Sequence, residues 1–295
     1  MGCVLWTNAS CSRWRDYCRL LRLDKPIGIL LLLWPTLWGL WIAARGFPPV
    51  PVLCVFVMGV VLMRSAGCAV NDYADRDFDR HVERTKNRPV TSGRVSPREA
   101  LCLAAGLSVL AFLITLPLGW HVVLMSIPAA FLAGSYPFTK RFFPMPQAYL
   151  GVAFGFGIPM AYVALIGDVP FEAWLLMLAN VFWTLAYDTE YALVDKPDDL
   201  KIGIRTSAVT LGRFDVAGVA VFYALSLMCW VGLAVLLNLG AVFFLALGLV
   251  LMCMFYHLVL IRQRDRQRCF KAFLHNNWIG AILFAGLVLS YWPAD

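Results

Sequence analysis

The chain has 295 residues, of which 61% are hydrophobic and 15% are charged, and its mean hydropathy is +0.72. A soluble domain of this length does not need so many apolar residues, so the composition excludes a soluble globular protein and indicates an integral membrane protein. The net charge of +7 is typical of basic membrane-flanking loops and does not require a nucleic-acid partner.

The residues before the first apolar run, 1–25, predict an amphipathic cytoplasmic segment. The side chains expected to face the bilayer are Trp14, Tyr17, Leu20 and Leu21, and those expected to meet lipid headgroups are Arg15, Arg19 and Arg22. The segment lacks the apolar stretch and cleavage site of a signal peptide, and it would be very short for a mitochondrial presequence. We therefore expect a bacterial inner membrane, with the mitochondrial inner membrane as the alternative.

The rest of the chain, residues 26–295, predicts an all-α membrane domain of about nine transmembrane helices in one bundle around a central cavity. Each apolar run is long enough to cross about 30 Å of hydrocarbon as a helix, and Pro, Gly or charged residues close it. The predicted spans are 26–44, 50–70, 100–118, 122–138, 149–166, 173–192, 216–237, 241–261 and 273–292.

Basic residues lie almost entirely on one side of these spans. Of the 25 Lys and Arg residues, 23 fall before the first span or in alternate loops. Arg45 lies on the opposite side and Arg64 inside the second span. The positive-inside rule then predicts that the N-terminus and all the charged loops are cytoplasmic and that the C-terminus is outside.

An acidic stretch, NDYADRDFDRHVERTKNRP at 71–89, follows the second span directly. If the helix continues for two more turns, Asn71, Asp75 and Asp79 recur on one face, with Asp72 adjacent to it. Like charges at this spacing repel, which favours a bound cation, and carboxylate and amide oxygens suit Mg²⁺. A solvated acidic loop is the alternative if this stretch is taken alone.

A second acidic stretch, YDTEYALVDKPDDLKIGIR at 187–205, ends the sixth span on the same side. It contains Asp188, Asp195, Asp198 and Asp199, followed by Lys201 and Arg205. Two acidic clusters, each followed by cations, predict a diphosphate site in which aspartates hold Mg²⁺ and Lys or Arg neutralise the leaving group. The clusters lie four spans apart, which hints at a duplicated unit.

Proline complicates the second cluster. Pro197 disfavours helical geometry at Lys196 and is uncomfortable inside a helix. We therefore expect a turn and a new helix starting near Pro197. In that case Asp195 and Asp199 need not share one face, and Asp198 becomes an alternative metal ligand to Asp199.

These residues also resemble a known family. Asn71, Asp72, Asp75 and Asp79 are similar to the NDxxDxxxD motif of the UbiA family of intramembrane prenyltransferases, and Asp195 and Asp199 resemble its second motif, DxxxD. The stretches at 22–41, 136–151 and 187–208 look like the 4-hydroxybenzoate polyprenyltransferase branch. The likeness extends over nearly the whole chain from Arg22.

The resemblance implies transfer of a polyprenyl chain from polyprenyl diphosphate to the ring of 4-hydroxybenzoate, ortho to the hydroxyl, as an early step of ubiquinone biosynthesis. It implies Mg²⁺ as cofactor, held by Asn71, Asp75 and Asp79 on one side and by Asp195 and Asp199 on the other. The residues implied at the diphosphate are Tyr136, Lys140 and Arg141, with Arg76, Arg84, Lys86 and Lys201 as further candidates. Asp75, Asp195, Lys140 and Arg141 would be catalytic.

The acceptor site is less constrained by spacing. Arg64 is a charge inside an apolar span, where it is costly unless it faces a cavity or partner; it could bind a carboxylate, pair within the protein or reach the membrane surface. Lys25 and Arg141 are further acceptor candidates. Asp188 and Tyr191 could orient the phenol or accept its proton, or simply hydrogen-bond within the bundle.

Two other functions keep the same acidic clusters. A UbiA-type enzyme with another acceptor, such as haem, homogentisate or a naphthoate, would differ only in the acceptor pocket. A transporter or channel with carboxylate gates is the alternative from another class, although these aspartates gather at one mouth and do not line a path across the bilayer.

Overall fold

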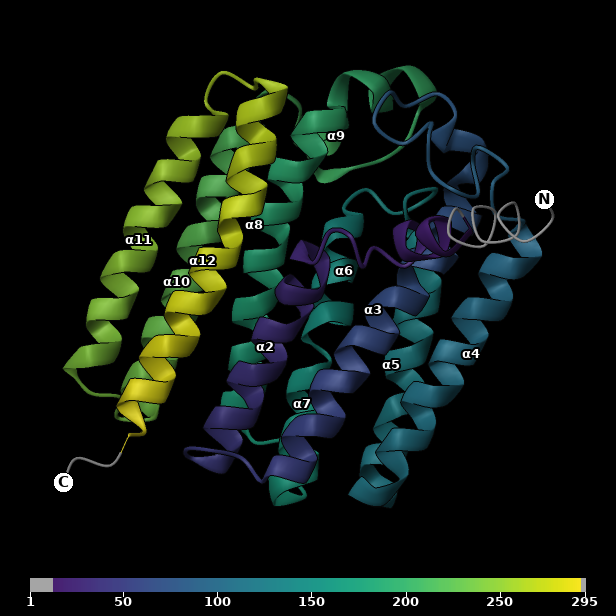
Figure 1. Cartoon of the computed structure of the whole chain (residues 1–295). Helices are drawn as coiled ribbons and strands as arrows, with labels where there is room; N and C mark the ends of the chain where they lie inside the picture. Colours follow the sequence, from purple (N-terminus) through teal and green to yellow (C-terminus); the bar gives the residue numbers. More distant parts are fainter. Residues whose placement is uncertain (1–12, 293–295) are drawn as a thin grey trace, which may run out of the picture.

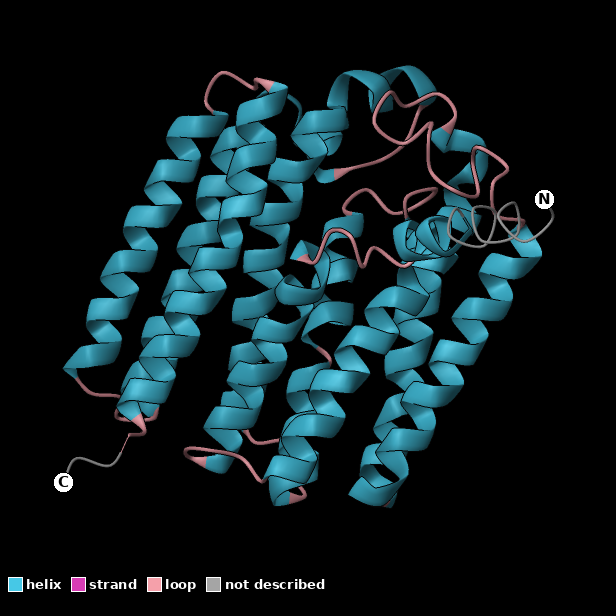
Figure 2. Cartoon of the chain, in the orientation of Figure 1, coloured by secondary structure: helices cyan, strands magenta, loops and turns pink. Residues whose placement is uncertain are grey.

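The computed structural model describes residues 13–292, and every regular element in that range is a helix (Figure 2). Residues 13–20 are helical. The helices that follow, labelled in Figure 1, are α2 (Ile27–Ala44), α3 (Val50–Asp79), α4 (Pro97–Thr115), α5 (Trp120–Thr139), α6 (Pro146–Gly155), α7 (Gly157–Ile166), α8 (Phe171–Ile202), α9 (Ser207–Leu211), α10 (Asp215–Leu236), α11 (Ala241–Ile261) and α12 (Arg266–Ser290).

The all-helical membrane fold is confirmed. Within residues 13–292, eight segments are long and apolar enough to cross a membrane. The predicted span at 173–192 lies in α8, which is not among the eight because polar residues such as Glu172, Asn180 and Asp188 lower its hydropathy. The count of nine therefore stays a prediction, although α8 runs alongside the other long helices (Figure 1).

Local signals fix where several helices begin and end. Ser96 and Glu99 form a reciprocal capping box at the start of α4, and the Asp265 side chain accepts from the Arg268 amide at the start of α12. The long helix α8 ends at Gly203, whose φ of 72° suits glycine. Pro159 has no N–H to donate to the Gly155 carbonyl, and the α6–α7 break lies at that point.

The bundle has two sides joined by α2, α6 and α7 (Figure 1). Helices α3, α4 and α5 form one side, and α8, α10, α11 and α12 form the other. The centre of the larger core is Trp38 of α2, whose ring lies 5.2 Å from that of Trp183 and 5.0 Å from that of Trp230. Trp38 is fully buried and is not among the residues that line the polar cavity described below, so its role is in packing.

The N-terminal segment differs from the prediction. Residues 1–12 of the predicted segment lie outside the described range. Trp14 is 67% exposed, as expected for a bilayer contact, but Leu20 is fully buried against residues of α3 and α4. The Tyr17 hydroxyl donates to Glu99, and Arg22 pairs with Asp72. The segment is thus packed onto the bundle by both apolar and polar side chains. Leu20 and Arg22, which were predicted to face the bilayer and the lipid headgroups, contact the protein instead.

Close helix packing beside the cavity depends on Gly151 in α6. A Cβ at this position would lie 2.9 Å from the Val181 Cα and 3.2 Å from its carbonyl oxygen in α8. We expect Gly151→Val to separate α6 from α8 and to lower the free energy of unfolding by about 1–3 kcal/mol. Thermal unfolding of the purified protein in detergent measures this loss.

The matched control is Gly248→Val in α11, where an added Cβ meets nothing within 4 Å. It should unfold at the temperature of the parent protein. Equal melting temperatures for the two variants would contradict the packing argument.

Candidate functional site

The first acidic cluster lies on one face of α3, because this helix continues past its apolar part to Asp79. Asn71, Asp72, Asp75 and Asp79 all line a cavity of about 980 Å³. The three carboxylates are at least nine-tenths buried. The predicted two-turn extension of the helix is therefore confirmed, and it brings the whole cluster to one cavity.

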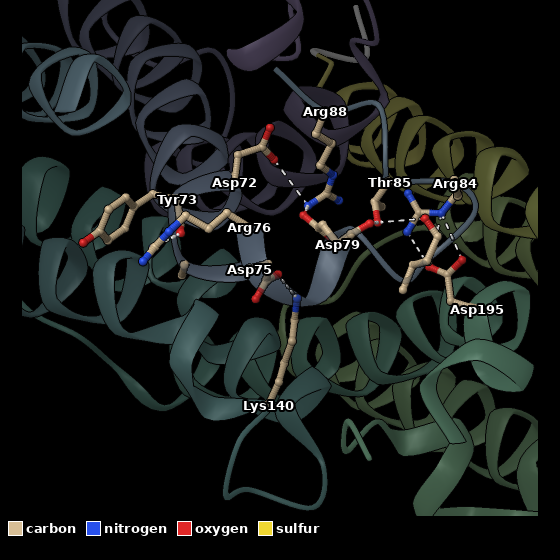
Figure 3. A network of polar contacts seen from close by, with 12 residues as sticks. Asp72, Tyr73, Asp75, Arg76, Asp79, Arg84, Thr85, Arg88, Lys140 and Asp195 are labelled. Atoms are coloured by element: carbon tan, nitrogen blue, oxygen red, sulfur yellow. Dashed lines mark hydrogen bonds and ion pairs between the residues drawn. The ribbon is translucent and has the colours of Figure 1, made fainter. Parts of the chain in front are cut away.

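Each of these carboxylates contacts a cation from another segment (Figure 3). Arg88 Nη1 lies 2.7 Å from Asp79 Oδ2 and 3.3 Å from Asp72 Oδ1. Arg22 Nη2 lies 3.1 Å from Asp72 Oδ1, and Lys140 Nζ lies 2.7 Å from Asp75 Oδ2. Since burying a lone carboxylate is costly, these partners offset part of the cost of placing the acidic face inside the bundle.

The same ion pairs raise the pKa of two of these basic side chains, Arg88 and Lys140. Burial disfavours the charged guanidinium of Arg88, but the carboxylates of Asp72 and Asp79 hold its pKa above the ordinary value. Burial likewise disfavours the charged ammonium of Lys140, while Asp75 raises its pKa. Both side chains therefore stay protonated and available to an anion at neutral pH.

The second acidic cluster faces the same cavity from α8. Asp195 and Asp199 line the cavity. Arg84, from the loop after α3, donates Nε to Asp195 Oδ1 and Oδ2 at 3.1 and 3.2 Å (Figure 3). Its guanidinium lies 4.5 Å from the centre of the Tyr191 ring. This contact joins the loop after the first cluster directly to the second cluster.

The prediction of a helix break at Pro197 is wrong. Helix α8 is continuous from Phe171 to Ile202, with Pro197 inside it. Asp195 and Asp199 are therefore one helical turn apart on the same face. Asp198, the alternative ligand, does not line the cavity and pairs with Arg266 at 3.2 Å. The structure favours Asp199 over Asp198 as a cavity ligand.

Only some of the predicted diphosphate residues reach the cavity. Tyr136, Lys140 and Arg84 line it. Four others do not line it, because closer partners or solvent hold their side chains elsewhere. Arg76 folds back on the Tyr73 ring and carbonyl, Lys86 pairs with Glu83, Lys201 is exposed, and Arg141 donates to the Ala74 carbonyl between the rings of Phe78 and Phe138.

Two basic residues of the site were not assigned to it from the sequence. Arg88 bridges Asp72 and Asp79, and Arg22 reaches Asp72 from the N-terminal segment. The loop after α3 contains several basic residues, and nothing in their positions along the sequence shows that Arg88 reaches the acidic cluster and Lys86 does not. Only the folded path of the loop separates them.

The donor set suits Mg²⁺. All the candidate ligands are oxygens, and Asp72 Oδ2 is buried with no hydrogen-bond partner among residues 13–292. In the same range, no three His, Cys, Asp or Glu side chains are placed to hold a metal ion by themselves. The residues therefore fit an ion that takes few protein carboxylates and completes its coordination with phosphate oxygens and water, which is the usual manner of Mg²⁺.

Most of the predicted acceptor residues line the same cavity. Arg64, Lys25, Asp188 and Tyr191 line it, whereas Arg141 does not. Arg64 Nε is buried without a hydrogen-bond partner in the described chain, and its guanidinium lies 5.5 Å from the Phe154 ring centre. An unpaired buried guanidinium nitrogen is a ready donor for an anionic ligand.

A second, apolar cavity of about 210 Å³ lies among α2–α7. Arg64, Asn71, Tyr136, Leu150 and Phe154 line both cavities. The polar and apolar cavities therefore meet beside Asn71, the first residue of the acidic cluster. A ligand with an anionic head and an apolar tail can bind with its head among the charges and its tail among the helices.

The fold and this cavity define an all-helical membrane protein built to hold an anionic head group beside an apolar tail. The model of the UbiA prenyltransferase family matches residues 32–292, and the chain belongs to this family. It is 61% identical to a 4-hydroxybenzoate octaprenyltransferase of Aromatoleum aromaticum over 95% of both chains. It is 64% identical to one of an Azoarcus species, over 93% of this chain and 96% of that one.

Solved structures show the same fold. The apo UbiA homolog from Aeropyrum pernix K1 superposes with a TM-score of 0.79 at 26% identity, covering 88% of this chain and 97% of that one. A UbiA homolog from Archaeoglobus fulgidus, bound to GPP and Mg²⁺, superposes with a TM-score of 0.70 at 16% identity, covering 94% and 99%. The second likeness supports the fold alone.

The Arg88 contacts predict a stability effect. In Arg88→Gln, Asp72 and Asp79 stay buried while their shared cation is lost, so we expect the free energy of unfolding to fall by about 3 kcal/mol or more. Denaturation in detergent measures the loss. Arg80→Gln is the control, because Arg80 is exposed and makes no ion pair with a described residue. Equal stability of the two variants would show that the pairing does not support the acidic face.

Proposed function

We propose that this protein transfers a polyprenyl chain from polyprenyl diphosphate to the ring of 4-hydroxybenzoate, ortho to the hydroxyl, with Mg²⁺ as cofactor. The observation that carries the proposal is the single cavity lined by Asp75 and Asp79 of α3 and by Asp195 and Asp199 of α8, with cations beside both sets. The names of the close relatives support the choice of acceptor.

The diphosphate would bind between the two acidic helices. Bound there, Mg²⁺ would neutralise phosphate oxygens and assist the departure of the diphosphate. Asn71, Asp72, Asp75 and Asp79 on α3 and Asp195 and Asp199 on α8 are the residues that would hold it. Lys140, Arg84 and Arg88 are placed to donate to diphosphate oxygens as negative charge develops on them.

The reaction needs a protected cation and an oriented ring. The allylic carbon–oxygen bond breaks, the diphosphate leaves with the electron pair, and the ring carbon ortho to the hydroxyl attacks the allylic carbon. The ring then loses the proton from that carbon. The apolar cavity beside Phe154 would hold the polyprenyl chain and keep water from the allylic cation.

The acceptor would lie beside Arg64 in the polar cavity. Arg64 would bind its carboxylate, with Lys25 as a second cation, and Asp188 and Tyr191 would face its hydroxyl. Gly28 lets Arg64 take this place, because a Cβ at Gly28 would lie 2.5 Å from Arg64 Nη2. Substrate selection would thus depend on charge at one end of the ring and hydrogen bonding at the other.

The reaction would take place at the cytoplasmic side of a bacterial inner membrane, as an early step of ubiquinone biosynthesis. The eight apolar helices indicate a multi-pass membrane protein. The basic loops at the cavity end support the cytoplasmic assignment through the positive-inside rule.

The first test is prenyl transfer by the purified protein in lipid, with 4-hydroxybenzoate and a polyprenyl diphosphate. We expect product with Mg²⁺ and none with EDTA, and no detectable product from Asp75→Ala or Asp195→Ala. Asp77→Ala is the matched control, because the Asp77 side chain is 67% exposed and lies outside the cavity. Full activity of folded Asp75→Ala and Asp195→Ala would refute the two-cluster site.

Acceptor binding is tested with Arg64→Gln. A hydrogen bond to a charged group contributes about 1.5–3 kcal/mol, so the KM for 4-hydroxybenzoate should rise by about 10- to 100-fold. The KM for the diphosphate should stay unchanged, and the preference of the parent for 4-hydroxybenzoate over 4-hydroxybenzamide should disappear. Arg76→Gln, on a side chain outside the cavity, should behave as the parent. An unchanged acid-to-amide preference in Arg64→Gln would rule out this carboxylate contact.

A further inference from the structure

The last turns of α8 are held on both flanks by ion pairs with residues of the C-terminal part of the chain. Asp195 and Asp199 face the cavity, whereas Lys196 and Asp198 do not line it. Successive residues of an α-helix point about 100° apart, so Lys196 and Asp198 lie on opposite flanks of the Asp195–Asp199 face. Each flank contacts the C-terminal helices.

The Lys196 flank is tied to a buried carboxylate. Lys196 Nζ donates to Asp215 Oδ2 at 2.5 Å and to the Gly212 carbonyl at 2.7 Å. Asp215, the first residue of α10, is fully buried. Arg264, in the α11–α12 connection, donates Nε to both Asp215 oxygens at 3.0 Å and Nη2 to Oδ1 at 2.6 Å. Asp215 therefore joins α8 to the C-terminal helices.

The Asp198 flank is tied to the same connection. Arg266, at the start of α12, lies 3.2 Å from Asp198. Arg264 and Arg266 are two residues apart, so one short connection holds both flanks of α8. These contacts hold the part of α8 that carries the two cavity carboxylates, Asp195 and Asp199.

These contacts surround Pro197, a proline inside the helix. A proline inside a helix removes one backbone hydrogen bond and costs about 3 kcal/mol, and it disfavours helical geometry at the residue before it. That residue is Lys196, whose side chain is fixed at two points. The helix nevertheless continues to Ile202. The contact of Asp215 with Lys196 thus acts on the residue whose helical geometry the proline disfavours.

We propose that Asp215, supported by Arg264, is a positioning residue that keeps the turn around Pro197 helical, so that Asp195 and Asp199 both reach the cavity. Asp215 touches neither substrate nor metal in this role. What the two carboxylates bind rests on the proposed function, whereas the effect of Asp215 on the helix does not.

The experiment compares the parent protein with Asp215→Asn and Arg264→Gln. Hydrogen–deuterium exchange of the metal-free protein reports on the amides of residues 194–202, and no ligand is needed for it. Electron paramagnetic resonance measures Mn²⁺ affinity in the presence of an unreactive prenyl thiodiphosphate. We expect faster exchange confined to residues 194–202 and a loss of Mn²⁺ affinity of about 10- to 100-fold in Asp215→Asn, as for other residues that orient metal ligands.

Arg213→Gln is the matched control. Arg213 lies two residues from Asp215, but its side chain lies over the Phe214 ring and makes no ion pair with a described residue. This variant should exchange and bind Mn²⁺ as the parent does. Parent-like exchange in folded Asp215→Asn would overturn the proposal, and so would faster exchange spread evenly over all the helices, which a purely structural role predicts.

A second substitution tests the link to the proline. Alanine at position 197 restores the missing backbone donor, so Asp215→Asn combined with Pro197→Ala should recover parent-like exchange and most of the Mn²⁺ affinity. Failure of this rescue would overturn the proposal. If Asp215→Asn does not fold, Arg264→Gln, which keeps the Lys196–Asp215 pair, should show the same changes to a smaller degree, and parent-like values there would overturn it.

The two proposals fail in different ways. A parent protein that transfers no prenyl group would refute the proposed function and leave the exchange result standing. A parent protein that transfers a prenyl group, beside an Asp215→Asn variant with unchanged exchange, would refute only the role of Asp215.

Discussion

The structure depends on the burial of carboxylates at one end of a membrane bundle. A carboxylate removed from water is costly unless a cation or several donors replace its hydration. Asp72, Asp75 and Asp79 meet this requirement with cations from three other segments, namely Arg22, Arg88 and Lys140. The N-terminal segment, the loop after α3 and the end of α5 are therefore drawn to the same place.

The loop after α3 takes its path from this constraint and from its own apolar residues. Val90 and Val95 are buried with Leu20 against α3 and α4, which fixes the base of the loop. From that base, Arg88 reaches the first acidic cluster and Arg84 reaches the second. One loop thus connects the two halves of the cavity, and a diphosphate bound there would meet cations that are already in position.

Helix α8 has a different task on each of its faces. Its cavity face carries Asp188, Asp195 and Asp199, while the opposite face hydrogen-bonds with α10 and α12. Glu190, for example, is fully buried and accepts from the Tyr223 hydroxyl and the Asn276 amide. Hydrogen bonds on the face opposite the cavity are directional, so they prevent α8 from rotating about its own axis. The cavity carboxylates therefore keep their direction.

The membrane class, the approximate positions of the long apolar segments and the two acidic clusters follow from the sequence alone, whereas the break between α6 and α7 and the short helix α9 do not. Long apolar runs and the NDxxDxxxD and DxxxD motifs are local features, since each is set by neighbours along one segment. The spacing at Asn71, Asp75 and Asp79 could be converted into one helical face because the helix period is fixed.

Which cations belong to the site, and which aspartate of the second cluster faces the cavity, depend on how the helices and loops pack together. Arg88 and Lys86 lie two residues apart in one basic loop, and only the folded path of that loop brings Arg88 to Asp72 and Asp79. Local rules predicted a break at Pro197, but contacts from α10 and the α11–α12 connection accompany an unbroken helix. These outcomes depend on residues far apart in the chain, whose meeting is determined by the packing of the whole bundle and not by any single segment.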